Sequence, residues 1–243
     1  MHVFITGGTR GIGLGLVKEF LKHGHRVSYT GTSESSINKH INELTGDFLA
    51  QICDVRDKSQ IKKVIFLAKE EFGNIDIWIN NAGVDQAHQF IYELNEEEIK
   101  RVIDINVVGT MLGTSAILKE MIDQGYGTVY NFEGLGSNNM VIQKTIVYGS
   151  SKRLIRYFSK ASNKEIKQYK SVHVGTIQPG MVFTDLLLNN MDETGMKVAR
   201  ILGNEVLEVT QYIVSKILKG KRKISFPTYR KAIRNIFKKN KAH

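Results

Sequence analysis

Tyr148 and Lys152 stand four residues apart in a segment of helical periodicity, and this spacing places both side chains on one face of a helix. A free tyrosine phenol has a pKa of about 10, and a neighbouring ammonium group favours the phenolate and lowers that pKa. A phenol tuned in this way can act as a general acid or base near neutral pH. Many exposed residue pairs on helices have the same spacing without any catalytic role. The other motifs must therefore decide whether Tyr148 and Lys152 form a catalytic pair or an ordinary surface pair.

A glycine-rich turn near the N-terminus has the composition of a phosphate-binding loop. Its glycines permit a tight turn and a close approach of the backbone to a pyrophosphate, and the following helix offers free N–H groups and the positive end of its dipole. A glycine cluster alone is also compatible with a bare turn, but its position after the first expected strand favours dinucleotide binding. The turn is Thr6-Gly7-Gly8-Thr9-Arg10-Gly11-Ile12-Gly13.

Short apolar runs alternate with longer segments of helical period, which predicts an α/β fold with a single doubly wound parallel sheet of Rossmann type. Strands are expected at Val3–Thr6, Arg26–Thr30, Phe48–Cys53, Asp76–Ile79, Thr128–Phe132 and Val172–Gln178. Helices are expected at Ile12–Lys22, Ser35–Glu43, Lys58–Phe72, Glu96–Asp123, Val147–Tyr169 and Glu205–Leu218. Right-handed crossovers then place helices on both faces of the sheet.

The composition is that of a globular α/β domain. The chain has 243 residues, of which 42% are hydrophobic and 24% charged. It has no run of 18 apolar residues, so no membrane-spanning helix is expected, and its N-terminus lacks the pattern of a signal peptide. The single cysteine, Cys53, fits a reducing compartment. We therefore expect a cytoplasmic location, and no metal site is predicted.

The formal net charge of +10 is concentrated at the C-terminus. Residues 216–243 contain eleven Lys and Arg residues and no acid, whereas residues 1–215 are close to neutral. This division predicts a dinucleotide-binding and catalytic domain over residues 1–215, a basic tail over 216–243, and no nucleic-acid binding. Apolar residues of the tail recur at helical spacing between cations, which predicts a basic amphipathic helix that packs on the domain or contacts an anionic membrane. They are Tyr229, Ala232, Ile233, Ile236 and Phe237.

Five motifs, in order, resemble those of the short-chain dehydrogenase/reductase family over about residues 1–190. Each motif is weak by itself, but five of them at the expected ends of strands form a specific pattern. They are the turn Thr6–Gly13, Asn80-Asn81-Ala82-Gly83, Asn106 in Asn106-Val107-Val108-Gly109, Tyr148-Gly149-Ser150-Ser151-Lys152, and Pro179-Gly180 with Thr184.

The resemblance implies a role for each motif. Tyr148 protonates a carbonyl oxygen while a nicotinamide delivers hydride, Lys152 also holds the nicotinamide ribose, and Asn106 organises a water that relays protons to the lysine. Asp54-Val55 resembles the adenine-side pair of the family, and Thr184 contacts the carboxamide. The residues expected to bind the cofactor are Gly7, Thr9, Arg10, Gly11, Ile12, Gly13, Thr32, Ser33, Asp54, Val55, Asn81, Ala82, Gly83, Tyr148, Lys152, Pro179, Gly180, Val182 and Thr184.

One catalytic position departs from the family pattern. The family usually has a serine thirteen residues before the tyrosine, where it binds the substrate carbonyl, but Leu135 stands there, and alignment on the strand end places Gly134 there instead. Ser137 or Glu133 replaces the serine if the loop shifts. Ser137 is therefore expected to be a catalytic residue together with Tyr148, Lys152 and Asn106. The alternative interpretation is that Ser137 belongs to a surface loop without a catalytic role. A lost oxyanion donor lowers the rate by about 10²–10³.

The second strand favours NADP(H) as the cofactor. An enzyme that uses NAD commonly has an acid at the end of this strand to bind the ribose 2′-hydroxyl, but no acid occurs here before Glu34. Arg10 stands within the glycine turn, and Thr32 and Ser33 can donate hydrogen bonds to a 2′-phosphate. A solvated surface cation is the alternative interpretation of Arg10.

Three stretches resemble the chlorophyll(ide) b reductase-like members of the family, which implies a bulky or lipophilic carbonyl substrate. They are 131–137, 147–152 and 179–188. The sequence therefore predicts an NADP(H)-dependent oxidoreductase that reduces a carbonyl or oxidises the alcohol of a small lipophilic molecule. A 3-oxoacyl reductase, or a weakly active cofactor-binding sensor or peripheral membrane protein, remains an alternative. A homodimer or homotetramer through the helices Glu96–Asp123 and Val147–Tyr169 is also implied.

Overall fold

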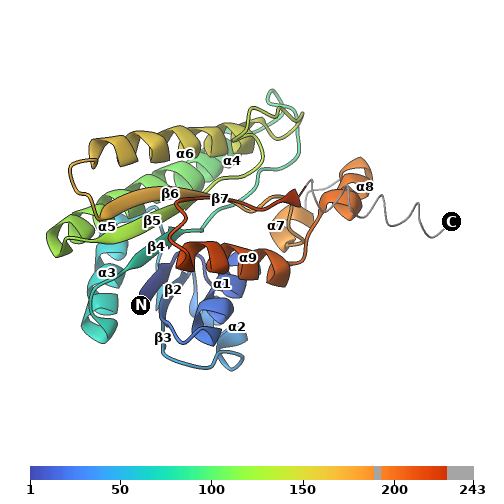
Figure 1. The fold of residues 1–243 in the computed structure, drawn as a ribbon. Helices are drawn as coiled ribbons and strands as arrows, with labels where there is room; N and C mark the ends of the chain where they lie inside the picture. The colour runs from blue at the N-terminus through green and yellow to red at the C-terminus, as the bar shows by residue number, and fades with distance from the viewer. Residues whose placement is uncertain (189–192, 229–243) are drawn as a thin grey trace.

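A computed structural model describes residues 1–188 and 193–228. Seven parallel strands form one sheet in the order β3-β2-β1-β4-β5-β6-β7, and helices cover both of its faces (Figure 1). The doubly wound Rossmann-type fold is thereby confirmed. The strands are β1 (His2–Ile5), β2 (Arg26–Gly31), β3 (Phe48–Ile52), β4 (Ile77–Asn80), β5 (Gly127–Phe132), β6 (Val172–Gln178) and β7 (Lys223–Ser225).

The helices begin and end close to the residues that the sequence predicts, with one interruption. A π-helical segment, η1 (Asp104–Gly109), separates α4 from α5 within the expected helix Glu96–Asp123. The helices are α1 (Gly11–Lys22), α2 (Glu34–Ile41), α3 (Lys58–Phe72), α4 (Glu96–Ile103), α5 (Thr110–Gln124), α6 (Ile146–Glu165), α7 (Asp185–Leu188), α8 (Glu193–Leu202) and α9 (Val206–Leu218).

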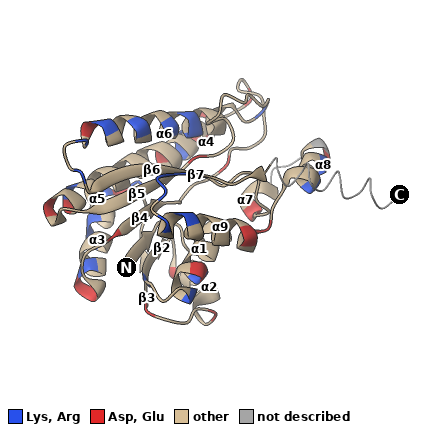
Figure 2. Ribbon diagram, viewed as in Figure 1, with Lys and Arg blue, Asp and Glu red and all other residues tan. Residues whose placement is uncertain are grey.

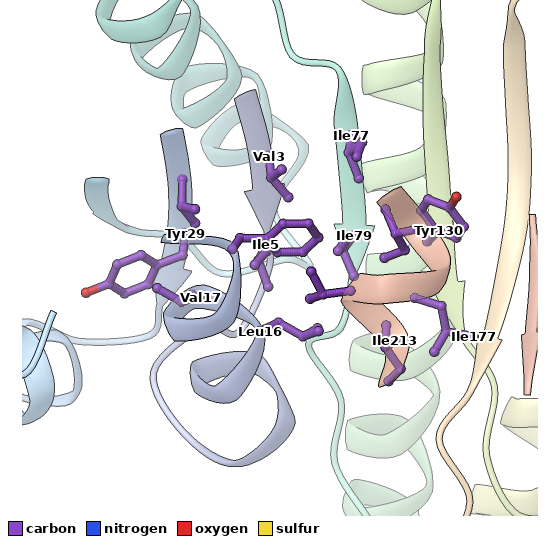
Figure 3. Close-up of a cluster of buried hydrophobic side chains, with 14 of the residues drawn as sticks. Val3, Ile5, Leu16, Val17, Tyr29, Ile77, Ile79, Tyr130, Ile177 and Ile213 are labelled. Carbon is purple, nitrogen blue, oxygen red and sulfur yellow. The ribbon is translucent and has the colours of Figure 1, made fainter. Parts of the chain in front are cut away.

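Two apolar clusters, one on each face of the sheet, hold the layers together. On one face, residues of β1, β2 and β4 pack against Leu16 and Val17 of α1 and Ile213 of α9 (Figure 3). On the other face, Trp78 and Phe4 stack with ring centroids 4.2 Å apart and lie beneath α3 and α5. Strands buried on both faces must be apolar throughout, which explains their nearly continuous hydrophobic sequences.

The strand order creates the crevice that positions the site. The chain runs outward from β1 through β2 to β3, and then crosses to β4 on the other side of β1. The loops that follow β1 and β4 therefore leave the carboxyl edge of the sheet in opposite directions. In open α/β sheets, ligands bind at such a topological switch point.

The C-terminal part of the domain differs from the expected division at residue 215. Strand β7 pairs with β6, and Ile224 and Phe226 join the buried cluster beside α1 and α9. The domain therefore continues past residue 215, and only the later part of the basic segment remains as a tail. The expected amphipathic helix, from Tyr229 to Phe237, lies outside the described residues. Helices α7 and α8 and strand β7 were not expected from the sequence.

The stretch Glu96–Gln124 has the length of a membrane-spanning helix and, over an 18-residue window, a mean hydropathy of 1.3. The sequence contains no uninterrupted run of 18 apolar residues, but this stretch meets the criteria by its length and average composition. Buried helices of other folds also meet them, and 44% of the window is buried here. Ile117 and Met121 of α5 are fully buried against the sheet, which accounts for the apolar character without a membrane.

Candidate active site

The turn between β1 and α1 forms a cradle that only glycines allow. Gly7 has a φ of +67° and Gly11 a φ of +53°, a region that L side chains rarely adopt. A Cβ on Gly7 would lie 2.9 Å from Ala82 Cα, and a Cβ on Gly13 would overlap with the Gly7 carbonyl oxygen. The turn is therefore tight enough only with glycines at these positions, and it leads directly into the N-terminus of α1, where helix N–H groups can bind the pyrophosphate of a dinucleotide.

The segment after β4 braces this cradle. Asn81 Nδ2 donates to the carbonyl oxygens of Thr6 and Gly7, at 3.0 and 2.8 Å. In return, Thr6 Oγ1 accepts hydrogen bonds from the backbone N–H groups of Asn81 and Ala82, both at 3.1 Å. Two motifs that lie about 75 residues apart in sequence thus fix one another, as expected for the two sides of the crevice.

The segment after β6 closes the far side of the cradle. A Cβ on Gly11 would lie 3.2 Å from Thr184 Cγ2, so Thr184 lies directly against the turn. Val182 is buried and pairs with Asn204 through an isolated β-bridge. Gly180, which follows Pro179, has a φ of +74°, and a side chain there would collide with Thr228. The structure therefore brings the expected segment from Pro179 to Thr184 to the crevice beside the glycine turn.

The ends of β2 and β3 carry the residues expected on the adenosine side. Ser33 caps α2 and its Oγ accepts the Ser36 N–H at 3.2 Å, while Thr32 and Arg10 are exposed. Thr9 packs against the end of β2, because a Cβ on Gly31 would lie 2.6 Å from Thr9 Cγ2.

After β3, Asp54 forms an exposed ion pair with Arg56, and hydrogen bonds from Arg56 hold the pKa of the Asp54 carboxyl below its ordinary value. A Cβ on Gly109 would lie 2.7 Å from Val55 Cγ2, so Val55 packs against η1.

Asn106 lies on the π-helical segment η1 and is fully buried. Its Oδ1 accepts the Val84 N–H and its Nδ2 donates to the Val84 carbonyl oxygen, both at 2.8 Å. Nδ2 also lies 3.2 Å from Ser151 Oγ on α6. The side chain therefore ties the loop after β4 to the helix of the tyrosine and lysine. Single π-turns of this kind occur frequently at functional sites.

Tyr148 and Lys152 both face the end of β5, as the four-residue spacing predicts. Lys152 Nζ lies 3.5 Å from the Phe132 carbonyl oxygen and 5.6 Å from the centroid of the Tyr148 ring. The amine also lies 3.5 Å from the position that a Cβ on Gly83 would occupy. Lys152 thus lies against the same Asn81–Gly83 segment that braces the glycine turn.

The structure corrects the expected effect of Lys152 on the phenol. Burial, with a smaller contribution from the negative charge of Asp85, raises the pKa of Tyr148 above its ordinary value instead of lowering it. The lysine lies over the ring face, where it does little to favour the phenolate. Burial also lowers the pKa of Lys152 to about 8. Near neutral pH the phenol therefore carries its proton, which is the form that can protonate a carbonyl oxygen.

Gly134 occupies the place opposite the phenol. A Cβ on Gly134 would lie 2.6 Å from Tyr148 Oη and 3.1 Å from Lys152 Cγ. Ser137 is fully buried, its Oγ forms no hydrogen bond within the described residues, and its carbonyl oxygen accepts from Arg153 and Arg156. Its expected catalytic role therefore has no supporting contact here and remains a prediction.

The model of the family described as short chain dehydrogenase matches residues 1–194 of the chain. The protein belongs to the short-chain dehydrogenase family. It is therefore related to oxidoreductases that use nicotinamide cofactors, as the five motifs indicate. The glycine turn fits such a cofactor, because the absence of a Cβ at Gly7 and Gly13, which would collide with Ala82 and with the Gly7 carbonyl oxygen, allows the tight turn that precedes the N-terminus of α1.

Similar members of the family include plant enzymes. The chain is 37% identical to the probable chlorophyll(ide) b reductase NYC1 of rice, Oryza sativa, over 209 residues, which are 77% of this chain and 41% of that protein. It is 32% identical to the rice chlorophyll(ide) b reductase NOL over 89% of this chain and 66% of that protein. The chain thus spans less than two thirds of these relatives. It is also 29% identical to a 3alpha-hydroxysteroid dehydrogenase of Mediterraneibacter gnavus, over 75% of this chain and 74% of that protein.

Solved structures of the family share the fold. A serine dehydrogenase determined in complex with NADP+ superposes with a TM-score of 0.81 at 25% identity, over 93% of this chain and 94% of that one. A Serratia marcescens short-chain dehydrogenase/reductase mutant superposes with a TM-score of 0.80 at 22% identity, over 93% of this chain and 95% of that one.

The motifs of the short-chain dehydrogenases do not include two residues that the structure adds to the site. Gln86 Oε1 accepts the Tyr148 backbone N–H at 2.8 Å, and Asp85 is the carboxylate whose charge acts on both Tyr148 and Lys152. The sequence signal was an acid and an amide that follow Asn80–Gly83 after one intervening residue, Val84. These two residues could not be assigned to the site from the sequence alone. Their role follows only from the structure, in which the loop lies against the first turn of α6, where helix N–H groups lack partners within the helix.

A groove of about 1100 Å³ lies on the outer side of α6, next to the residues that precede the helix. Figure 2 shows Lys and Arg residues along this helix. The groove contains neither Tyr148 nor Lys152, so it is separate from the crevice of the expected catalytic pair. Its lining includes the exposed apolar residues Met140, Val141, Ile142, Ile146, Leu154 and Tyr157, and the cations Arg153, Arg156 and Lys160.

Proposed function

We propose that the protein is an NADP(H)-dependent oxidoreductase that interconverts a carbonyl group and the corresponding alcohol on a small lipophilic molecule. The observation that carries the proposal is the position of the Tyr148–Lys152 pair. Lys152 Nζ packs against Gly83, which continues the segment that braces the glycine cradle through Asn81. The lysine beside the proton donor and the glycine cradle thus both contact one short stretch of chain, Asn81–Gly83.

The chemistry of reduction follows from the protonation states. Bound NADPH supplies the hydride for the carbonyl carbon. The protonated phenol of Tyr148 donates its proton to the carbonyl oxygen, and the carbonyl thereby gains the two electrons and two hydrogens of the alcohol. Lys152, whose pKa is lowered to about 8, exchanges protons near neutral pH and lies beside the phenol to restore its proton. Oxidation of the alcohol is the same sequence reversed.

The preference for NADPH over NADH rests on the end of β2. The first acid after this strand is Glu34, which begins α2 and is exposed. Arg10 is an exposed cation at the N-cap of α1, and Thr32 and Ser33 lie at the start of α2. Cations and hydroxyl groups favour a 2′-phosphate, whereas an acid at the strand end would repel it.

The proposal of a lipophilic substrate rests on the relatives and on Gly134. The named relatives act on chlorophyll(ide) b and on hydroxysteroids, which are bulky and largely apolar molecules. A glycine opposite the phenol removes both the bulk and the hydrogen bond of a side chain at that place. Substrate binding would then depend more on apolar contact than on a second hydroxyl donor.

Gly134 also motivates a second candidate function, a cofactor-binding protein with little turnover. A missing donor at the carbonyl can lower the rate by about 10²–10³, and a protein without turnover would use NADPH as a sensed ligand. This alternative predicts tight NADPH binding that does not depend on Tyr148.

A panel of aldehydes and ketones, including steroid and long-chain carbonyls, tests both functions by NADPH consumption at 340 nm. The wild type should reduce at least one lipophilic member. Tyr148→Phe should lower kcat by about 10²-fold or more, a much larger effect than on the NADPH affinity measured by nucleotide fluorescence. NADPH binding without turnover of any carbonyl would favour the second function, and no binding of either nucleotide would reject both.

We also propose that two copies associate through the outer face of α6, which is one of the two helices through which a homodimer or homotetramer was expected from the sequence. Tyr157 is 75% exposed and Val141 is 86% exposed, and contiguous apolar surface of this kind is typical of interaction sites. Light scattering of the wild type and of Tyr157→Glu tests the assembly. A wild type that stays monomeric at high concentration would reject it.

A further inference from the structure

The groove beside α6 is a second concave site, and the proposed reaction does not use it. Its volume of about 1100 Å³ is comparable with that of ligand pockets, which measure about 300–1,000 Å³. Its lining residues come from the loop 135–145 and from residues 146–160 of α6. The α6 groove, defined by these two segments, is thus a hollow between two parts of one chain, a shape that suits a single ligand molecule.

The loop side of the α6 groove exposes apolar side chains to water. Val141 is 86% exposed, and its neighbours Met140 and Ile142 are each 40% exposed. Leu154 of α6 also lines the groove and is exposed. Removal of apolar surface from water favours association, so these side chains favour a ligand with an apolar chain.

The helix side of the α6 groove carries three cations. Arg153, Arg156 and Lys160 are spaced three and four residues apart, so they share one face of the helix. Arg153 Nη1 and Arg156 Nη1 each donate to the Ser137 carbonyl oxygen at 2.9 Å. The shared acceptor holds the two guanidinium groups side by side, and a carbonyl oxygen does not neutralise their charge.

These cations have no acidic partner in the part of the chain that the structure describes. Elsewhere, Arg56 and Arg101 each form an ion pair with a carboxylate. No described carboxylate forms an ion pair with the three cations, and no acidic residue is among those that line the groove. A guanidinium group presents its N–H donors in a planar fork that matches a carboxylate. Two such groups without an acid therefore favour a ligand with an anionic head.

We propose that the α6 groove binds an amphipathic carboxylate, a soluble molecule with an apolar chain and one carboxylate. The carboxylate lies between Arg153 and Arg156, and the chain lies along the exposed side chains of residues 140–142. The cations account for the charge of the ligand, and the apolar residues account for its chain. The proposal is independent of the oxidoreductase function, because the groove contains neither Tyr148 nor Lys152.

This site is compatible with the proposed association of two copies. In a pair with two-fold symmetry, the same patch lies on both sides of the interface. Association through α6 therefore brings the cations of the two copies towards one another, which is unfavourable. One bound carboxylate in each groove offsets that repulsion.

Isothermal titration calorimetry of the full chain with decanoate, below its micelle-forming concentration, tests the site. Two control ligands separate the contributions: 1-decanol has the chain without the charge, and acetate has the charge without the chain. Decanoate should bind at least about 10-fold more tightly than either, because charge-assisted hydrogen bonds and apolar contact both contribute. Equal binding of decanoate and 1-decanol would contradict the role of the cations.

Charge variants test the head of the ligand. The double variant Arg153→Gln/Arg156→Gln should weaken decanoate binding by about 10-fold or more, whereas Arg153→Lys/Arg156→Lys keeps the charge and should stay within about 3-fold of the wild type. Lys164→Gln removes an exposed cation of α6 outside the groove and should have no effect. The Lys160 side chain donates no hydrogen bond to another described residue, so Lys160→Gln, with an expected loss of about 3-fold, decides if the double variant fails to fold.

A decanoate analogue with a diazirine at the end of its chain locates the bound molecule. On irradiation it should label residues 139–146. Labelling only around Tyr148, or an unchanged affinity in Arg153→Gln/Arg156→Gln and in Lys160→Gln, would overturn the proposal. An affinity that falls as the protein concentration rises would show that a second copy fills the groove, and binding to phosphatidylglycerol vesicles without binding of free decanoate would show a membrane surface. Either of these results would also reject it.

Discussion

The substitution Gly13→Ala tests the link between the glycine turn and the segment after β4. An added Cβ would overlap with the Gly7 carbonyl oxygen and lie 2.5 Å from Asn81 Nδ2. The first neighbour is backbone, and the second is an amide held by hydrogen bonds to Thr6 and Gly7. Neither can move away without the loss of at least one hydrogen bond of the brace.

The magnitude follows from three contributions. The loss of a hydrogen bond between nearly buried groups costs about 1–3 kcal/mol, and overpacking adds about 1–3 kcal/mol. Replacement of glycine by alanine within α1 returns about 1 kcal/mol of helix propensity. We therefore expect the free energy of unfolding to fall by about 1–5 kcal/mol, together with a loss of NADPH affinity of at least about 10-fold.

Urea unfolding and NADPH fluorescence titration measure the two effects, and Gly149→Ala on α6 serves as the control. A Cβ on Gly149 would meet its nearest neighbours at 3.8 and 3.9 Å, which is ordinary contact, so this change should be neutral or stabilising by up to about 1 kcal/mol. A Gly13→Ala protein with wild-type stability and wild-type NADPH affinity would refute the reasoning that the turn is closed by Asn81.

Three further substitutions test other parts of the site. Lys152→Met should raise the free energy of unfolding at pH 7 by about 2–4 kcal/mol. The pKa of Lys152 near 8 in the folded protein lies below its ordinary 10.5, so the stability of the wild type rises as the pH increases through this window. Urea unfolding at pH 7 and at pH 10.5 should therefore show that the stability difference between the variant and the wild type becomes smaller at the higher pH. Arg10→Ala should weaken NADPH binding by about 10-fold and leave NADH binding unchanged; equal losses for both nucleotides would contradict a 2′-phosphate contact. Gly134→Ala should lower kcat by about 10-fold or more without a change in NADPH affinity, because its Cβ displaces the Tyr148 hydroxyl; unchanged kinetics would show that the phenol tolerates the displacement.

The sequence predicted the features that depend on local patterns. Six strands appear within one or two residues of the expected bounds, since buried parallel strands are apolar throughout. Strand β7, by contrast, is only three residues long, and two of them are exposed, so neither length nor apolar content marked it. Its pairing with β6 depends on a chain reversal after α9 that periodicity does not encode.

The errors at the site arise from contacts between distant segments. The π-helical turn at Asn106 accompanies hydrogen bonds to Val84, 22 residues away, and helical periodicity alone predicts an uninterrupted helix. The pKa of Tyr148 was expected to fall because spacing reveals the neighbouring lysine but not the burial that raises it. Patterns of residue type thus identified which groups meet, whereas their protonation depends on how much water the fold excludes.

Residues 81–86 connect the two halves of the proposed chemistry. Asn81 holds the glycine turn, Gly83 packs against the Lys152 amine, and Gln86 holds the N-terminal turn of α6 at Tyr148. Asn106 fixes the middle of the stretch by binding both backbone groups of Val84. Hydride transfer requires the nicotinamide and the proton donor to be placed to within a fraction of an ångström. A stretch of six residues that contacts both sides of the crevice can set the distance between the nicotinamide and the proton donor without long side chains. A substitution at the centre of this stretch should therefore impair turnover more than nucleotide binding.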